Sequence, residues 1–381
     1  MKKLRVRTDR GYTVPFLFNV GQRNAVFIER SLVPLAKLHR SADAFAPLPE
    51  PGYDIIHSLN AVPILTRRPY LITFEDYLPR VPEDRYVGWL EDWLREKLLS
   101  SQCVRLIAIS EYARRQFRWQ NRHFDRLADL ERKLQVIYPA AGLKRTTPKQ
   151  SSGRLKLLFV GGDFLRKGGP AVVRSHERLR KEGIPVETIV VSQRAPPPSD
   201  YVAPLSLAYA QQEFSRLNQP GITVHKVLPH GQVMELMEEA DYLVFPTLHD
   251  TFGFVSLEAL SCGTPVITSR TCVQPEIVED GYCGFLLPIE NDEQVGKWKW
   301  LYRNKEPGYL DAYRQTVEGL SRALSDRLMQ YWTSGQKEYT RLSEGALERM
   351  RTRFNPEKAR EILEQLYELC ASIGPSGRRK S

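Results

Sequence analysis

Short apolar runs alternate with longer amphipathic stretches along most of the chain. In the first half the runs contain mostly Val, Ile, Leu and Phe, which is typical of buried strands. The expected strands are Leu4–Arg7, Asp54–His57, Tyr70–Phe74, Arg105–Ile109 and Leu134–Tyr138. Helical periodicity lies between them, for example over Asn24–Leu38 and Arg85–Leu99. Strands that alternate with helices predict a parallel sheet with right-handed crossover connections.

The same alternation restarts after residue 153 and predicts a second parallel sheet. Its helices include Pro170–Lys181 and Gln232–Glu239, and its expected strands are Leu157–Val160, Glu187–Val191, Ile222–Val227, Tyr242–Phe245, Pro265–Thr268 and Phe285–Leu287. Residues 139–153 lack periodicity and are rich in Ala, Gly, Pro, Thr and Ser, which is typical of a linker. We therefore expect an α/β protein with an N-terminal domain at residues 1–140, a linker at 141–153 and a C-terminal domain at 154–350.

The end of the sequence is mainly helical in pattern. We expect a helical addition to the second domain at about residues 291–350, and the sequence assigns it no function beyond packing. Asn355, Pro356 and Glu357 then suit a helix N-terminus, because Asn caps, Pro fits the first turn and Glu favours the positive end. We expect the terminal helix at residues 351–372 and a disordered basic tail at 373–381.

The composition is that of a globular, non-membrane protein. The chain has 381 residues, which is too long for one hydrophobic core and suits two domains. It has no apolar run of eighteen residues and no apolar signal segment after its basic N-terminus, so we expect a cytoplasmic protein. The five cysteines are scattered and predict reduced thiols.

The positive charge of the chain is confined to its first part. Residues 1–150 carry 26 Lys and Arg against 16 Asp and Glu, whereas the rest of the chain is balanced. Arginines at 114, 115, 118, 122 and 126 recur at helical spacing beside aromatic residues. This pattern predicts an anionic partner, either the inner face of a membrane, a phosphorylated acceptor or nucleic acid. A basic face that serves only solubility is the alternative.

Two acidic residues carry the strongest chemical signal. Asp250 and Glu258 lie eight positions apart, around a turn at Gly253 and the start of a helix. Carboxylates accept hydrogen bonds from sugar hydroxyls, while the amides of a helix N-terminus bind phosphates. This combination predicts a ligand that has both, such as a nucleotide-diphosphate sugar.

A second chemical element follows the first strand of the second half. Gly161 and Gly162 end the strand, and Arg166 and Lys167 precede the next helix. Glycines let the backbone approach a diphosphate, and the two cations offset charge on a leaving nucleotide diphosphate. The spacing is neither that of a dinucleotide-binding fingerprint nor that of a Walker loop.

These two elements together resemble the donor site of retaining GT-B glycosyltransferases of the family-4 type (glycosyltransferase group 1). Residues 275–281 and 284–288 match the same family downstream. Asp250 stands where the family usually has Glu, and Gly162 where it often has Arg. The resemblance implies two Rossmann-like domains that face each other across a cleft, and a C-terminal helix that crosses back to the first domain.

The resemblance also implies roles for individual residues. Glu258 would hold the ribose hydroxyls and Asp250 those of the transferred sugar. The diphosphate would lie against Arg166 and Lys167 and against the backbone of a set of donor-binding residues, Gly161, Gly162, Thr251, Phe252, Gly253, Phe254 and Val255. Glu75 stands where the family has a histidine near the anomeric carbon. It would accept a hydrogen bond from a sugar hydroxyl or lie near the developing oxocarbenium charge, and the alternative is an exposed loop acid. The implied catalytic residues are Asp250, Lys167, Arg166 and Glu75.

Weaker matches lie in the first half and in two loops. Ser110 suits the N-cap of a helix within a family-like run, and residues 19–24 stand where the family has an acceptor-side loop. The base of the donor would contact the loops around residues 191–195 and 227–232.

The expected reaction moves a hexose-type sugar from a nucleotide-diphosphate sugar to a hydroxyl on a glycan or a lipid-linked acceptor. We expect no cofactor and no metal, because the seven histidines are scattered and no Asp-x-Asp stands at a strand end. We expect no nucleic-acid partner, since no such motif appears. The alternatives are a sugar-nucleotide epimerase of the same fold and a non-catalytic protein that binds nucleic acid or other anions.

Overall fold

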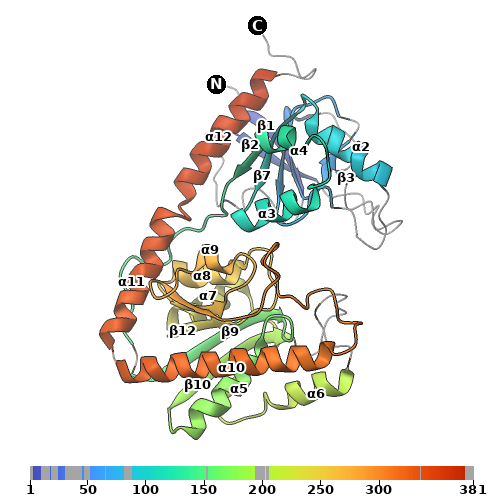
Figure 1. Ribbon diagram of the computed structural model, residues 1–381. Helices are drawn as coiled ribbons and strands as arrows, with labels where there is room; N and C mark the ends of the chain where they lie inside the picture. Colours follow the sequence, from blue (N-terminus) through green and yellow to red (C-terminus); the bar gives the residue numbers. More distant parts are fainter. Residues whose placement is uncertain are drawn as a thin grey trace. The chain divides into compact units, whose positions relative to one another are not determined.

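The computed structural model describes residues 3–9, 18, 25–30, 45–46, 52–64, 66–80, 88–151, 153–193, 202, 206–334 and 336–373. The chain forms two compact units, Met1–Gly142 with Phe354–Ser381, and Leu143–Arg353 (Figure 1). The expected loop at residues 19–24 and the tail beyond Ile373 lie outside the described residues.

The first unit contains a six-stranded parallel sheet in the order β2-β1-β4-β6-β7-β8. Its strands are β1 (Leu4–Asp9), β2 (Ala25–Arg30), β4 (Ile55–Leu59), β6 (Tyr70–Phe74), β7 (Cys103–Ala108) and β8 (Leu134–Val136). A small sheet pairs β3 (Phe45–Ala46) with β5 (Val62–Pro63). The described helices before residue 142 are α2 (Gly88–Leu99), α3 (Glu111–Gln120) and α4 (Leu127–Arg132). The five strands predicted for this half are confirmed.

The helix predicted over Asn24–Leu38 is wrong in its described part. Ala25–Arg30 form strand β2, which pairs in parallel with all six residues of β1. The run Val26-Phe27-Ile28 is β-branched and aromatic, so it favours a strand once a partner strand is available. The helical periodicity of the segment gave no sign of that partner. Residues 31–38 lie outside the described part of the chain.

The second unit contains another six-stranded parallel sheet, in the order β11-β10-β9-β12-β13-β14. Its strands are β9 (Leu155–Asp163), β10 (Val186–Gln193), β11 (Ile222–His225), β12 (Tyr242–Phe245), β13 (Val266–Ser269) and β14 (Gly284–Leu287). The connecting helices are α5 (Gly169–Lys181), α6 (Leu207–Ser215), α7 (His230–Glu239), α8 (Phe254–Ser261) and α9 (Gln274–Ile277). The strand order reverses between β9 and β12, and ligands of doubly wound sheets bind at the carboxyl ends of the strands at such a reversal.

The helical addition begins later than the sequence predicted. Residues 291–308 form turns with one isolated bridge, and only then do α10 (Tyr309–Ser334) and α11 (Gln336–Thr352) follow. Trp298 holds the non-helical segment, because its buried ring packs edge-on against Tyr309, with the ring planes at 63° and the centroids 5.7 Å apart. The indole is buried while the segment is non-helical, so tertiary packing overrides the helical pattern here. Helix α10 packs along α5 (Figure 1).

The last helix, α12 (Pro356–Ile373), returns to the first unit. Asn355 caps it as expected, since its Oδ1 accepts a hydrogen bond from Glu357 N at 2.8 Å. The helix packs on β4 and β7, where the Tyr367 hydroxyl lies 2.8 Å from His57 Nδ1. The return of the C-terminal helix, which the family resemblance implied, is thus present.

Candidate active site

The candidate site lies at the carboxyl ends of β9 and β12, where the strand order of the second sheet reverses. The loop after β9 carries Arg166 and Lys167, and the loop after β12 carries Asp250. These two loops are far apart in the sequence. The parallel pairing of their strands brings them together, as the position of the motifs predicted.

A buried ion pair joins the two loops. Lys167 Nζ lies 2.6 Å from Asp250 Oδ2 and donates to His249 O at 3.3 Å. Both side chains are largely buried, at 11% and 16% exposure. Burial lowers the pKa of Lys167, while the Asp250 carboxylate raises it and so opposes that effect. The pair therefore places an ammonium group, fixed by two contacts, beside a carboxylate at the carboxyl ends of the strands.

Two glycines allow the loops to come this close. Gly168 has φ +80°, and a Cβ there would come within 2.0 Å of Pro246 O. A Cβ on Gly161 would meet the Lys167 side chain at 2.9 Å. Gly162 faces open space instead, so its backbone is approachable from outside. Gly168 is thus required for the contact between the loops, and Gly162 leaves room for a ligand.

Arg166 is held within its own loop. Asp163, which is buried, accepts hydrogen bonds from Arg166 N at 3.1 Å and from Arg166 Nε at 3.2 Å. Leu248 N donates to Arg166 O at 2.9 Å, which ties this loop to the one after β12. The sequence predicted Arg166 as a phosphate contact but did not predict Asp163 as the group that orients it.

The expected phosphate-binding backbone surrounds the start of α8. Gly253 caps this helix with φ +80°, and no side chain caps it. A Cβ on Gly253 would lie 2.2 Å from Gln274 Nε2, and Ser256 Oγ donates to Gln274 Oε1 at 3.0 Å. The amide hydrogens in the first turn of a helix lack helical acceptors. The turn at the start of α8 therefore packs against the Gln274 side chain. It is formed by the expected residues Thr251, Phe252, Phe254 and Val255.

Glu258 lies one turn further along α8 and is partly buried, at 25% exposure. Its Oε1 lies 2.9 Å from Nε2 of His230, the first residue of α7. Burial raises the pKa of Glu258, and His230 lowers it by a smaller amount. The sequence indicated the loop at 227–232 as a base contact, but it did not indicate that His230 pairs with Glu258.

Sequence reasoning also missed the surroundings of His249. This residue is buried, and its pKa lies well below the usual value because of burial and then because of Lys297, Lys167 and Arg166. Lys297 is buried too, with Nζ 5.6 Å from the centre of the Tyr302 ring. Lys297 comes from the segment between β14 and α10, where no motif signalled it. The carboxyl edge of this sheet thus gathers three cations around a neutral imidazole.

Glu75 belongs to the first unit, just after β6. Its Oε1 accepts a hydrogen bond from Asn60 Nδ2 at 3.0 Å, and Glu75 N donates to Asn60 Oδ1 at 3.1 Å. Arg80 Nη2 lies 3.5 Å from the same Oε1. The carboxylate is therefore fixed at the end of a strand and is not a freely exposed loop acid. Its contact with a sugar stays a prediction.

The arginine stripe of the first unit differs from the prediction. Helix α3 ends at Gln120, so Arg122 and Arg126 lie beyond it. Acidic neighbours pair with most of the set: Arg114 with Glu111 at 2.7 Å, Arg118 with Glu131, and Arg126 with Glu96 and Asp129, both at 3.1 Å. The predicted cap is confirmed, since Ser110 Oγ accepts from Ala113 N at 2.9 Å.

Two features are absent from the described residues. Within them, no group of three or more His, Cys, Asp or Glu side chains is arranged to hold a metal ion. None of their helices is both long enough and apolar enough to cross a membrane.

The second unit matches a known family. Residues 144–307 match the family model described as "Glycosyl transferases group 1". An alpha-maltose-1-phosphate synthase from Mycobacterium tuberculosis is 31% identical over 140 residues, which are 36% of this chain and 34% of that one. The lipopolysaccharide glucosyltransferase WaaG from Escherichia coli is 35% identical over 135 residues, 34% of this chain and 32% of that one. Each match thus spans about a third of the curated relative.

Solved structures match over nearly the whole chain. A glycosyltransferase from Rickettsia africae aligns with a TM-score of 0.59 at 13% identity, covering 97% of this chain and 99% of that one. Anabaena Alr3699/HepE, solved in complex with UDP-glucose, aligns with a TM-score of 0.57 at 14% identity, covering 97% and 100%. The predicted GT-B fold is confirmed, and the family resemblance is confirmed for residues 144–307.

Proposed function

We propose, from the premise that residues 144–307 form a group 1 glycosyltransferase domain, that this chain is a retaining glycosyltransferase. It moves a hexose-type sugar from a nucleotide-diphosphate sugar to a hydroxyl group on a glycan or a lipid-linked acceptor. The observation that carries the proposal is the Lys167–Asp250 ion pair beside the uncapped start of α8. The pair sets a cation and a carboxylate 2.6 Å apart, and a sugar diphosphate offers phosphate oxygens to the first and hydroxyl groups to the second.

Each residue of this site has a role in the reaction. The ammonium of Lys167, the guanidinium of Arg166 and the amides at the start of α8 stabilise the negative charge that grows on the leaving diphosphate. Asp250 accepts hydrogen bonds from the transferred sugar, and Glu258 accepts them from the ribose. As the bond between the anomeric carbon and the phosphate oxygen breaks, the acceptor oxygen bonds to that carbon on the same face. The acceptor proton passes to the departing phosphate oxygen.

This scheme needs no separate general base and no metal ion. The leaving phosphate takes the proton, and the cations of Arg166 and Lys167 take the place of a divalent metal. Transfer that continues unchanged in excess EDTA supports this part of the proposal. Strict dependence on added Mg²⁺ or Mn²⁺ contradicts it.

Donor binding is the direct test of the proposed function. UDP-glucose is the first probe, because the fold neighbour HepE was solved with it, and other nucleotide sugars follow. We expect one of them to raise the melting temperature of the wild type but not of Glu258→Ala. Glu239→Ala, at an exposed acid at the end of neighbouring α7, is the matched control and should respond like the wild type. Conversion of the donor to an epimer without acceptor would favour the epimerase instead.

We further propose that the first unit contacts an anionic membrane that carries the acceptor. Helix α2 supports this, because Trp89 is 73% exposed and Trp93, one turn along, is 37% exposed. Lys97, one turn further, places Nζ 5.3 Å from the centre of the Trp93 ring. Tryptophan and lysine together suit the interface between lipid headgroups and water.

Co-sedimentation of the full chain with vesicles tests this contact. We expect binding to vesicles with anionic lipid, weakened by salt, and lost when Trp89 and Trp93 are both changed to Ser. Trp332→Ser, at an exposed tryptophan of the second unit, should bind like the wild type. Equal binding to neutral vesicles, or none at low salt, would leave a soluble anionic acceptor as the better explanation of the basic first part.

A further inference from the structure

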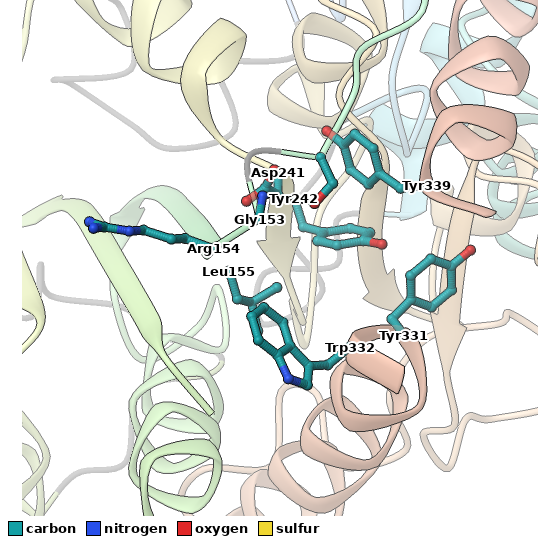
Figure 2. A pocket seen from close by; sticks show the side chains of 9 residues that line it. Gly153, Arg154, Leu155, Asp241, Tyr242, Tyr331, Trp332 and Tyr339 are labelled. Carbon is teal, nitrogen blue, oxygen red and sulfur yellow. Dashed lines mark hydrogen bonds between the residues drawn. The ribbon is translucent and has the colours of Figure 1, made fainter. Parts of the chain in front are cut away.

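A pocket lies within the second unit at the amino ends of the strands of the same sheet, opposite the candidate active site. Leu155 and Tyr242 begin strands β9 and β12, and α10 and α11 contribute Tyr331, Trp332 and Tyr339 (Figure 2). Its volume is about 230 Å³. The nine residues of β9, at about 3.3 Å per residue, set this pocket about 26 Å from the candidate active site. The two sites are therefore separate.

Aromatic rings form a rigid wall of the pocket. The Tyr242 ring packs at nearly right angles to Tyr331, with centroids 5.7 Å apart, and to Tyr339, at 5.6 Å. All three tyrosines are buried, whereas Trp332 is 39% exposed. The indole is therefore the part of the wall that an entering molecule can cover.

Two hydroxyl groups in this wall lack a hydrogen-bond partner among the described residues. The phenol oxygens of Tyr242 and Tyr339 are buried, and neither has a hydrogen-bond partner among the residues that the structure describes. Buried polar groups normally have a partner, either from the protein or from an ordered water molecule. A simple packing defect between helices is lined by apolar groups, whereas this aromatic wall also carries these two phenol oxygens.

The remaining lining is mostly polar, and its two charged side chains both have partners. Asp241 is buried, and its Oδ2 accepts a hydrogen bond from Lys156 N at 2.8 Å. Arg154 extends away from the rings in Figure 2, and its Nη1 lies 3.4 Å from Glu187 Oε1. Ser151 and Gly153 complete the rim. The lining thus contains polar groups but no unpaired ionic group among its described residues.

We infer that this pocket binds a neutral saccharide. A pyranose has an apolar C–H face, which an exposed indole covers, and a ring of hydroxyls that require both donors and acceptors. Pockets for small ligands combine apolar walls with a few placed polar groups in this way. The volume, below the range of about 300–1,000 Å³ typical of drug-sized ligands, suits one sugar unit of a longer chain.

Two other ligand classes fit less well. A phosphorylated ligand would need a free cation, and the one cation named among the described lining residues, Arg154, pairs with Glu187. A quaternary ammonium ion also binds to aromatic groups. Its usual site is a cage of several ring faces, whereas here Trp332 is the exposed ring and the three tyrosines are buried.

Saccharide binding would be a function of the helical addition, α10 and α11, beyond packing. Trp332, Tyr331 and Tyr339 all belong to α10 and α11, to which the sequence assigned packing alone. The pocket would hold a glycan chain away from the reacting sugar. The choice of a saccharide rests on the proposed function, whereas the binding itself does not require turnover.

Saturation-transfer NMR of the full chain tests the inference without any donor. The probes are four neutral trisaccharides built from glucose, mannose, galactose and N-acetylglucosamine. We expect transfer to the C–H protons of at least one of them. Trp332→Ala should raise its dissociation constant at least tenfold, and Trp332→Phe should raise it less. Trp89→Ala, an exposed tryptophan of the first unit, is the matched control and should bind like the wild type.

Several outcomes would overturn the inference. These are no transfer to any probe, equal binding by a folded Trp332→Ala variant, or displacement of the saccharide by tetramethylammonium at lower concentration than by free sugar. Binding that persists in a protein without transferase activity would support the pocket and contradict the proposed function. Transferase activity without saccharide binding would support the proposed function and contradict the inference about the pocket.

Discussion

The two units share a doubly wound parallel sheet but distribute their charges in opposite ways. The first part of the chain carries all of the excess positive charge, yet its arginines at 114, 118 and 126 pair with nearby carboxylates on the surface. The second unit lies almost wholly in the part of the chain whose charges balance. It nevertheless gathers Arg166, Lys167 and Lys297 around one imidazole at the edge of its sheet.

This difference shows that net charge is a poor guide to the position of a site. An exposed ion pair in water contributes little, and salt screens it. A buried cation is costly unless the fold supplies partners, so its presence indicates a requirement for that charge. The local burial of Lys167 is therefore more informative than the total charge of residues 1–150.

The strongest test of the comparison is the removal of the buried cation. Because Lys167 would stabilise the leaving diphosphate in a site shielded from water, Lys167→Ala should lower kcat/KM by about 100- to 1,000-fold. Lys181→Ala, at an exposed lysine at the end of α5, is the control and should change it little. Steady-state kinetics on folded variants provide the measurement.

A double-mutant cycle adds to this test. Asp250→Asn should weaken the sugar contact and also release Lys167, so its effect and that of Lys167→Ala should be clearly less than additive. Full additivity, or wild-type turnover in a folded double variant, would mean that the 2.6 Å ion pair has no part in donor use.

The next effect concerns the backbone that brings the two loops together. Gly168 and Gly183 both have positive φ, at +80° and +75°, but only Gly168 has a neighbour that an added Cβ would strike. Both Ala variants carry conformational strain, and Gly168→Ala should cost about 1–3 kcal/mol more from overpacking. Urea unfolding of the two variants measures the difference. Equal losses would contradict the close approach to Pro246.

A smaller effect should appear in the pH dependence of donor affinity. Burial raises the pKa of Glu258, so on acidification its carboxylate protonates at a higher pH than an ordinary glutamate and stops accepting from the ribose hydroxyls. Burial lowers the pKa of Lys167, so the ammonium is lost at a lower pH than in an ordinary lysine. Donor affinity should therefore fall on both the acid and the alkaline side.

Calorimetric titration across the pH range separates the two limbs. Glu258→Gln should bind the donor more weakly and lose the acid limb, while it keeps the alkaline one. An acid limb that persists in Glu258→Gln would assign it to another group.

The smallest effect is expected at the surface of the first unit. Arg118→Gln removes an exposed ion pair with Glu131 and should change the free energy of unfolding by no more than about 1 kcal/mol, with a smaller change at high salt. Denaturant unfolding at two salt concentrations measures it. A loss of several kcal/mol would place these arginines on a par with the buried cation and remove the contrast between the units.

The sequence predicted the sheets well because each strand is a short apolar run between turn residues. It failed over Ala25–Arg30 and residues 291–308 for one shared reason. In both places the conformation is decided by packing against a partner outside the segment, strand β1 in one case and the ring of Tyr309 in the other. Periodicity reports which side of a segment is apolar, but not what will cover it.

The candidate site was predictable as far as its motifs reached. Asp250, Glu258, Arg166 and Lys167 were all named from local pattern, and the strand order places them at one edge. Their supporting groups were not predictable, since Asp163, His230 and Lys297 carry no motif and act only through distances in the folded chain. The Trp332 pocket was missed because it joins the linker and strand starts to two later helices.

The route of the chain through the two units has a consequence for biosynthesis. The first unit needs α12, whose Tyr367 contacts His57 across 310 residues of sequence. The second unit is contiguous and can complete its sheet during translation. At about 5–20 residues per second, the ribosome needs tens of seconds between the last strand of the first sheet and the helix that covers it. During that interval the nascent first sheet lacks its cover, and this is the period in which a chaperone would be of most use to the chain.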